Sequence, residues 1–425
     1  VAALAVAPFA AAPAPVAKSP RAAAGAPQPT TDPIAVRVAK VVVLDDKDAI
    51  VNDAVILVRD GKIEKILASA DAAIPPAYRV YDRRDDWLVP GIVEAHNHCA
   101  AGGWEELHDM VYQTNPGLTT ASVPQPDADW AKLSRMGGVT TAIMIPGSGT
   151  NISGMGTLVS FGGHTPDEIV LRAPGALKIA QAGNPEWYFG GNGRSFMNWN
   201  TRQTLRKARD YNAAWEAFEN GKTKTKPAYD IFWEPFRPIF QKKIPATVHT
   251  QIYQVVHATI FMVYEEFGLW TVTDHSTFDA WKLGVITRDT DIWTVCGPRC
   301  YFPDFTARRM IGIAAGWWKN GVRRVGINTD SPVIPQEELP FQAAMNCWYG
   351  SQPYPALKAT TAVPAKALGV YDKVGSIEVG KQADFAVWTG DPVDPRSACV
   401  LTVVRGDVIY DASREADTNN GKRRF

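Results

Sequence analysis

LVPGIVEAHNHC, residues 88–99, is the stretch of sequence that decides the fold. It is an apolar strand that ends in two histidines, two residues apart. Side chains two residues apart on a strand point to the same side, so we expect His96 and His98 to face the interior together. Two imidazoles on one side of a strand end can share one cation. Ordinary core packing also produces this motif, so the motif alone does not define a site.

Five further strand-like runs follow this stretch and alternate with longer helical or loop segments. They are GVTTAIMIPG (138–147), GALKIAQAG (175–183), IPATVHTQ (244–251), LWTVTDHS (269–276) and VRRVGINTDSP (322–332). Strands separated by helices predict a parallel sheet, and about 270 residues is the size at which eight βα units close into a barrel. We therefore expect an α/β fold with a (β/α)8 TIM-type barrel over residues 91–369.

The segments on either side of the predicted barrel have the pattern of antiparallel strands and hairpins. They are AVRVAKVVVLD (35–45), AVILVRDGKIEKILA (54–68), YRVYDRRDDWLVPG (78–91), ADFAVWTGDP (383–392) and VLTVVRGDVIYD (400–411). Tight turns are expected at Asp60-Gly61 and at Gly406-Asp407. We expect residues 34–90 and 370–415 to pair into one small composite β-sandwich.

The first 33 residues differ in composition from the rest of the chain. Ala, Pro and Val dominate them, and they contain no periodic apolar face. The apolar stretch and its Ala-x-Ala positions predict the remnant of a secretory signal followed by a disordered linker, and hence a periplasmic or secreted protein. A low-complexity tail on a cytosolic protein is the alternative interpretation.

The composition excludes several classes of partner. Forty-four basic residues balance 44 acidic ones, so no long-range field attracts nucleic acid or a membrane surface. No run reaches the roughly 18–20 apolar residues that span a bilayer. Five cysteines in 425 residues are too few for a disulfide scaffold, although Cys296 and Cys300 are close enough to close one small loop. We expect a small-molecule substrate, and a homo-oligomer is the default for an assembly.

Other chemically active residues also lie at the ends of predicted barrel strands. His249 and His275 each end such a strand, and Lys178 and Asp330 lie near the ends of apolar strands. An unpaired charge buried there costs several kcal/mol. Because active sites of such barrels lie at the carboxyl ends of the strands, we expect these residues to converge with the histidine pair. A metal centre supplies the partners that the buried charges need.

These residues give the chain a resemblance to the amidohydrolase superfamily, and within it to the imidazolonepropionase-like and prolidase-like branch. The resemblance covers nearly all of residues 36–412. It rests on PGIVEAHNH (90–98), GVTTAIMIPGSGTNISGMG (138–156), the later histidines and aspartate in the expected order, and VGSIEVGKQADFAVWTGDP (374–392). The Gly-Lys-x-Ala-Asp pattern in the last segment is highly specific. The resemblance implies a metal-dependent hydrolase with a distorted (β/α)8 barrel and a composite β-sandwich.

The resemblance also implies two divalent metal ions, and zinc suits nitrogen-rich ligands of this kind. The implied ligands are His96, His98 and Asp330 for the more buried ion, His249 and His275 for the more exposed ion, and Lys178 as an N-carboxylated bridge. A free lysine is a cation with a pKa near 10.4 and repels a metal ion, whereas its carbamate is an anionic ligand. Carboxylation requires the neutral amine, which burial favours.

The implied reaction is hydrolysis of a C–N amide bond in a dipeptide, an N-acyl amino acid or a cyclic amide. A metal-activated bridging hydroxide attacks the carbonyl carbon, and Asp330 carries the proton of the water to the leaving nitrogen. His275 is a second catalytic candidate, as a group that helps to hold the developing oxyanion.

Two alternatives to this two-metal hydrolase remain open. The first is a mononuclear imidazolonepropionase- or deaminase-type hydrolase, which usually carries an acidic residue shortly after the fifth-strand histidine. Gln251 and Gln254 follow His249 in this chain, and this favours two metals. The second is a metal-free structural or interaction protein on the same fold, which the ligand set disfavours because several buried polar groups would lack partners.

The substrate contacts are expected near the mouth of the barrel. Residues 184–240 are predicted to cap it, and the later half of residues 190–221 within them has helical periodicity. Arg194 and Arg202 are candidates to receive a substrate carboxylate through a bidentate pair, although solvent-facing arginines are an equal interpretation. Tyr253 is a third candidate contact. The glycine-rich stretch PGSGTNISGMG (146–156) lacks the ending of a phosphate-binding loop and is predicted to be a rim loop.

Overall fold

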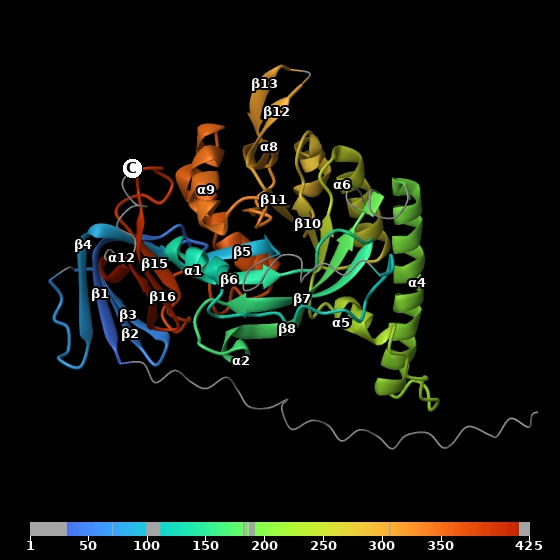
Figure 1. Cartoon of the computed structure of the whole chain (residues 1–425), viewed down its shortest axis with the longest axis horizontal. Helices are drawn as coiled ribbons and strands as arrows, with labels where there is room; N and C mark the ends of the chain where they lie inside the picture. The colour runs from blue at the N-terminus through green and yellow to red at the C-terminus, as the bar shows by residue number, and fades with distance from the viewer. Residues whose placement is uncertain are drawn as a thin grey trace, which may run out of the picture.

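The computed structural model of the chain describes residues 32–69, 71–98, 111–181, 183, 185–186, 192–305 and 307–415. Two large sheets organise these residues, and a two-stranded hairpin projects from them (Figure 1). The predicted α/β class, with a distorted barrel and a β-structure built from both ends of the chain, is confirmed. The predicted signal and linker, residues 1–33, lie outside the described residues apart from the last two. None of the helices in the described part combines the length and apolar character that a bilayer crossing requires.

The first sheet has seven strands and combines the two ends of the chain. In spatial order they are β17 (Asp407–Asp411), β16 (Cys399–Val404), β15 (Phe385–Trp388), β4 (Arg79–Pro90), β1 (Ile34–Val42), β2 (Ile50–Arg59) and β3 (Lys62–Leu67). β15 and β4 pair antiparallel, with Phe385 opposite Pro90, so blue and red strands lie together in Figure 1. Alternate apolar side chains from both segments, such as Val36 and Phe385, share one buried cluster.

Two hairpin turns of this sheet, between β2 and β3 and between β16 and β17, are tight two-residue connections. Asp60 and Gly61 connect β2 and β3 with φ values of 50° and 72°, as the sequence predicts. The other turn is formed by Arg405 (φ 49°) and Gly406 (φ 81°), one residue earlier than predicted. The aspartate of the Gly-Lys-x-Ala-Asp pattern, Asp384, stabilises this second turn, because its Oδ1 accepts a hydrogen bond of 2.8 Å from the amide of Arg405.

Asp384→Asn is expected to change how stability depends on pH. Burial raises the pKa of Asp384 from 3.8 to about 6, while the amide and side chain of Arg405 lower it. Between these two pKa values the folded chain binds more protons than the unfolded chain, so wild-type stability falls as the pH rises through pH 4–6, by about 3 kcal/mol in total. Urea unfolding of the metal-free protein is measured at pH 4, 5 and 7. The free energy of unfolding of the variant should increase relative to that of wild type as the pH rises. A parallel pH dependence of the two proteins would contradict this.

The second sheet has eight strands and curls into the barrel. In spatial order they are β14 (Val325–Ile327), β11 (Trp293–Cys296), β10 (Thr271–His275), β9 (Ala246–His249), β8 (Val170–Ala180), β7 (Ile152–Ser160), β6 (Val139–Met144) and β5 (Ile92–Asn97). The two outer strands approach each other at an isolated bridge between Asn97 and Ser331, where the amide of His98 also donates to the carbonyl oxygen of Ser331 (2.9 Å).

One barrel strand runs against the others. β7 is antiparallel to both of its neighbours, β6 and β8. The prediction of a rim loop over residues 146–156 is therefore wrong from Ile152 onward. The glycines that suggested a loop allow close backbone approach instead: Gly154 has a φ of 116°, and a Cβ there would lie 2.6 Å from the carbonyl oxygen of Leu118.

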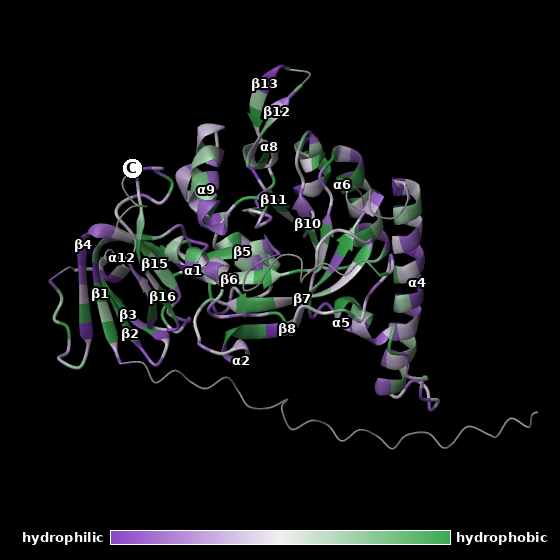
Figure 2. Ribbon diagram, viewed as in Figure 1, coloured by the Kyte–Doolittle hydropathy of each residue, from purple (hydrophilic) through white to green (hydrophobic). Residues whose placement is uncertain are grey.

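Helices surround the barrel strands, and Figure 2 shows apolar residues in the strands and many hydrophilic residues on α4. The helical elements are α1 (Asp129–Met136), α2 (Pro166–Ile169), α4 (Arg194–Glu219), η3 (Glu234–Phe236), α5 (Arg237–Phe240), α6 (Tyr253–Thr259), η4 (Ile260–Glu266), η5 (Ala280–Leu283), α7 (Gly284–Thr287), α8 (Ile313–Lys319), η6 (Gln336–Glu338), α9 (Leu339–Trp348), α10 (Pro353–Lys358), α11 (Ala362–Ala367) and α12 (Ala412–Glu415). The strands β12 (Tyr301–Asp304) and β13 (Arg309–Gly312) form the projecting hairpin. The helix predicted in the later half of residues 190–221 is confirmed, as part of α4, which begins earlier, at Arg194.

Cys296 and Cys300 do not close a loop. Both are free thiols, and both are buried in the main apolar cluster of the barrel. Burial raises the pKa of each thiol, so both behave as small apolar core residues.

Candidate metal centre

Four histidines meet at the carboxyl ends of the barrel strands. His96 belongs to β5 and His98 follows it, whereas His249 ends β9 and His275 ends β10. The ring centroid of His96 lies 5.0 Å from that of His98 and 4.5 Å from that of His275, and His275 lies 4.5 Å from His249. All four side chains are buried. The fold therefore joins three separate strands through a continuous row of imidazoles.

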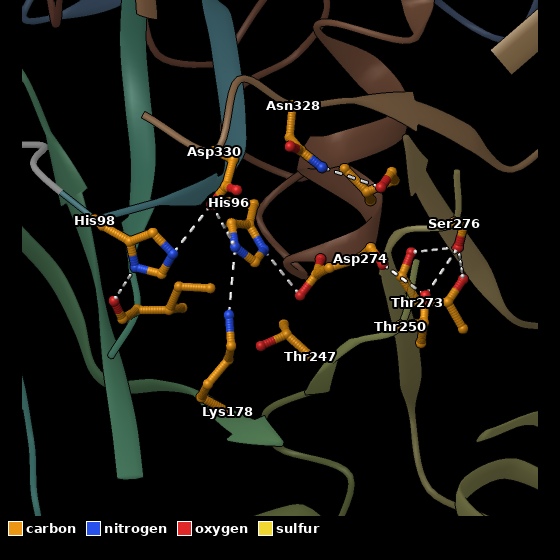
Figure 3. A network of polar contacts seen from close by, with 12 residues as sticks. His96, His98, Lys178, Thr247, Thr250, Thr273, Asp274, Ser276, Asn328 and Asp330 are labelled. Atoms are coloured by element: carbon orange, nitrogen blue, oxygen red, sulfur yellow. Dashed lines mark hydrogen bonds and ion pairs between the residues drawn. The ribbon is translucent and has the colours of Figure 1, made fainter. Parts of the chain in front are cut away.

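Lys178 and Asp330 lie against the same row. The Nζ atom of Lys178, on β8, is 3.3 Å from Nε2 of His96 (Figure 3). Oδ1 of Asp330, just after β14, is 3.2 Å from Nε2 of His96 and 3.1 Å from Nε2 of His98. Lys178 is fully buried, whereas the side chain of Asp330 is 16% exposed. The structure thus brings together all six side chains that the sequence places at strand ends.

The backbone is unusual at two of these residues. His275 has a φ of 67° and Asp330 a φ of 52°, both in the left-handed region that non-glycine residues rarely adopt. Such conformations cost about 1–3 kcal/mol each and are concentrated at functional sites, where the surrounding structure maintains them. The backbone turn at His275 also ends the regular alternation of side-chain directions along β10. As a result, Asp274 and His275 both contact the ring of His96.

The cluster also contains two buried carboxylates that were not predicted from the sequence. Oδ2 of Asp274 lies 3.0 Å from Nδ1 of His96. Glu94 accepts hydrogen bonds from the amide of His96 (3.1 Å) and from the amide (3.0 Å) and hydroxyl (2.6 Å) of Thr329. Burial raises the pKa of Glu94 to about 7, and its hydrogen bonds with Thr329 and His96 lower it. An acidic residue inside an apolar strand was the available signal for both.

The protonation states of the histidines favour metal binding at two of them. Burial holds the pKa of His249 well below its usual value and that of His275 at about 3, so both rings are neutral at physiological pH. Burial also lowers the pKa of His98. None of the four ring nitrogens of His249 and His275 has a hydrogen-bond partner among the described residues. A neutral imidazole with a free lone pair is the form that binds a metal ion.

The pKa values of His96 and Lys178 are set by opposing effects of burial and neighbouring charges. Burial and Lys178 lower the pKa of His96, but Asp274 and Asp330 raise it above its usual value. Burial lowers the pKa of Lys178 to about 8, against the opposing effect of Asp274 and Asp330. A lysine of this pKa is partly neutral at physiological pH, which is the form that reacts with carbon dioxide.

The donor set fits a divalent metal ion. Ligand atoms of His96, His275 and Asp330 lie within 4.8 Å of one another, and His98 and His249 adjoin them. Imidazole nitrogen and carboxylate oxygen are typical ligands of zinc. Four buried ring nitrogens without partners would be costly in a site that binds nothing.

The three predicted substrate contacts lie apart from this row. Nε of Arg194 pairs with Glu186 (3.1 Å), and Nε of Arg202 pairs with Glu266 (2.7 Å). Tyr253 begins α6, where it packs against the main apolar cluster and stacks on His257. Among the described residues, no hydrogen bond, ion pair or ring contact joins these three residues to the four histidines of the row.

Comparisons with known proteins find similarity to amidohydrolases. A sequence model of the amidohydrolase family matches residues 246–420. The amidohydrolase tasK of Hapsidospora irregularis is 23% identical over 394 residues, which are 84% of this chain but 40% of that protein. The imidazolonepropionase of Shewanella frigidimarina is 25% identical over 80% of this chain and 87% of its own length. The crystal structure of an amidohydrolase from Thermotoga maritima superposes with a TM-score of 0.78 and 27% identity, over 89% of this chain and 100% of that one.

Proposed function

We propose that this chain cleaves a small amide with the help of two divalent metal ions, with zinc as the first candidate. The chain belongs to the amidohydrolase superfamily and is thus a hydrolase of C–N bonds. The substrate classes are dipeptides, N-acyl amino acids and cyclic amides. The residues proposed to hold the ions are His96, His98, Lys178, His249, His275 and Asp330.

One observation carries this proposal. The paired imidazoles of His249 and His275 are buried, neutral and without partners among the described residues, directly beside Lys178, His96 and Asp330. A purely structural cluster is expected to satisfy its buried nitrogens with hydrogen bonds.

The reaction needs a nucleophile, a polarised carbonyl and a proton carrier. Divalent ions in such a site supply a lowered pKa of bound water and Lewis-acid polarisation of the carbonyl. Asp330 is suited to carry the proton. Burial raises its pKa, but the nearby histidines lower it well below the usual value, so the carboxylate is ionised and accepts a proton at Oδ1 or Oδ2. Its partly exposed side chain then delivers that proton to the leaving nitrogen, while the buried walls keep bulk water away.

A second candidate is a single-metal hydrolase of a cyclic amide. It is favoured by the relative named imidazolonepropionase and by the compact group of His96, His275 and Asp330, which has room for one ion. In that case Lys178 stays a free amine. The number of metal ions per chain separates the two candidates.

Metal removal and reconstitution test the proposal. The purified protein is treated with a chelator and then reconstituted with zinc, manganese or cobalt. For each preparation, the metal content and the turnover of dipeptides, N-acyl amino acids and cyclic amides are measured. We expect at least about a 100-fold loss of kcat/KM on chelation and recovery with two ions per chain. A maximum at one ion selects the second candidate. Unchanged turnover after complete metal removal rejects both.

The same panel tests Arg194 and Arg202 as receivers of a substrate carboxylate. Arg206 is a matched control for Arg202, because it lies on α4 and also pairs with Glu266. We expect Arg202→Met to raise KM about tenfold for substrates with a carboxylate and to leave KM for neutral amides unchanged. Equal effects of Arg202→Met and Arg206→Met would indicate that these arginines only support the helix.

A further inference from the structure

Two successive residues of β10 contact the same imidazole. Asp274 approaches Nδ1 of His96, and His275 packs its ring against that of His96. Adjacent residues of a regular strand point to opposite sides. The left-handed φ of His275 (67°) ends the strand at this point, and both side chains reach the barrel interior.

The two ring nitrogens of His96 have different surroundings. Nδ1 lies 3.0 Å from Oδ2 of Asp274, which is an ion-pair distance without the geometry of a hydrogen bond, and both side chains are completely buried. Nε2 faces Nζ of Lys178 at 3.3 Å and Oδ1 of Asp330 at 3.2 Å (Figure 3). A proton on Nδ1, donated to a carboxylate, leaves the lone pair of the neutral ring on Nε2.

The nearby Glu94 cannot serve the same purpose. Its oxygens accept hydrogen bonds from the backbone amide of His96 and from Thr329, so it fixes the main chain and not the ring. Asp274 is therefore the carboxylate that faces Nδ1 of the imidazole, whereas Asp330 faces Nε2.

We propose that Asp274 is a positioning residue that holds the proton of His96 on Nδ1 and directs Nε2 toward a metal ion. This inference rests on the proposed function, because it requires that His96 bind a metal. The carboxylate also orients the ring and increases its basicity, and loss of such a partner typically lowers metal affinity about 10–100-fold.

Zinc affinity of three variants tests this role. Asp274→Asn keeps the size of the side chain but removes the charge, Asp274→Glu restores the charge, and Asp384→Asn makes the same change at a buried carboxylate in the other sheet. Competition with a chromophoric chelator measures the zinc Kd. We expect Asp274→Asn to raise the Kd about 10–100-fold, Asp274→Glu to recover at least part of this, and Asp384→Asn to stay within about twofold of wild type.

Nitrogen-15 NMR of histidine-labelled wild type provides a second readout that needs no variant. With zinc bound, His96 should carry its proton on Nδ1. A proton on Nε2, or a folded Asp274→Asn protein with an unchanged zinc Kd, overturns the role of Asp274 while the proposed function stands. If wild type binds none of zinc, manganese and cobalt, the proposed function and this inference both fail.

Discussion

Lys178→Ala is expected to lower kcat/KM by about 10³-fold or more, because under the proposed function a carboxylated Lys178 would help to hold both metal ions, whose stabilisation of the reacting groups is worth several kcal/mol. Burial lowers the pKa of Lys178 to about 8, which makes the neutral amine available. Under the proposed function this amine would add carbon dioxide to form a carbamate and release a proton. The variant should contain no more than one zinc ion per chain, against two in wild type.

Rescue by a small carboxylate separates chemistry from folding. The alanine leaves a space in a fully buried position, so added formate or acetate should restore part of the activity of Lys178→Ala. Carbon-13 NMR of wild type equilibrated with labelled bicarbonate should show a carbamate signal that the variant lacks. Two zinc ions and activity within tenfold of wild type in Lys178→Ala would disprove the bridging role.

Asp330→Asn is expected to lower kcat by about 10²–10⁴-fold, the usual contribution of a general acid–base group, with a much smaller change in KM. Asparagine keeps the size of the side chain but cannot carry the proton between water and leaving nitrogen. The ionised carboxylate of Asp330 also pairs with His96 and His98, so weaker zinc binding is expected as well.

The measurement for Asp330→Asn must hold the metal content constant. Assays at saturating zinc isolate the loss of the proton carrier, and thermal unfolding of the metal-free variant checks the fold. The pH dependence of kcat provides an independent readout, because the acidic limb assigned to Asp330 should disappear in the variant. Retention of that limb with a normal kcat would assign the proton transfer to another group.

Several parts of the fold could be predicted because local sequence determines them. The turn at Asp60-Gly61 needs positive φ at both positions, and the apolar runs ending at His249 and His275 have the length and composition of buried strands. The direction of β7 could not be predicted, because Gly154 and its neighbours are read as a loop unless the close approach of Leu118 is known. Long-range contact, and not propensity, made this segment a strand.

The residues of the candidate site could likewise be predicted from the sequence only in part. Spacing alone placed His96 and His98 on one side of a strand, and the barrel topology brought them to His275. Asp274 was not predicted, because side chains of a regular strand alternate in direction and Asp274 would then point away from the side of His275. Only the backbone turn at His275 brings both to one ring, and no residue type in this stretch signals a positive φ.

Because β4 pairs with β15, the ribosome must produce the entire barrel between Pro90 and Phe385 before this pair can form. At roughly 5–20 residues per second, the nascent chain spends about 15–60 s with the β4 edge unprotected, which favours association with other nascent chains or with chaperones. A premature stop between Asp330 and Phe385 leaves that edge permanently open. Such truncated chains should be found in aggregates even though every proposed metal ligand has already been translated.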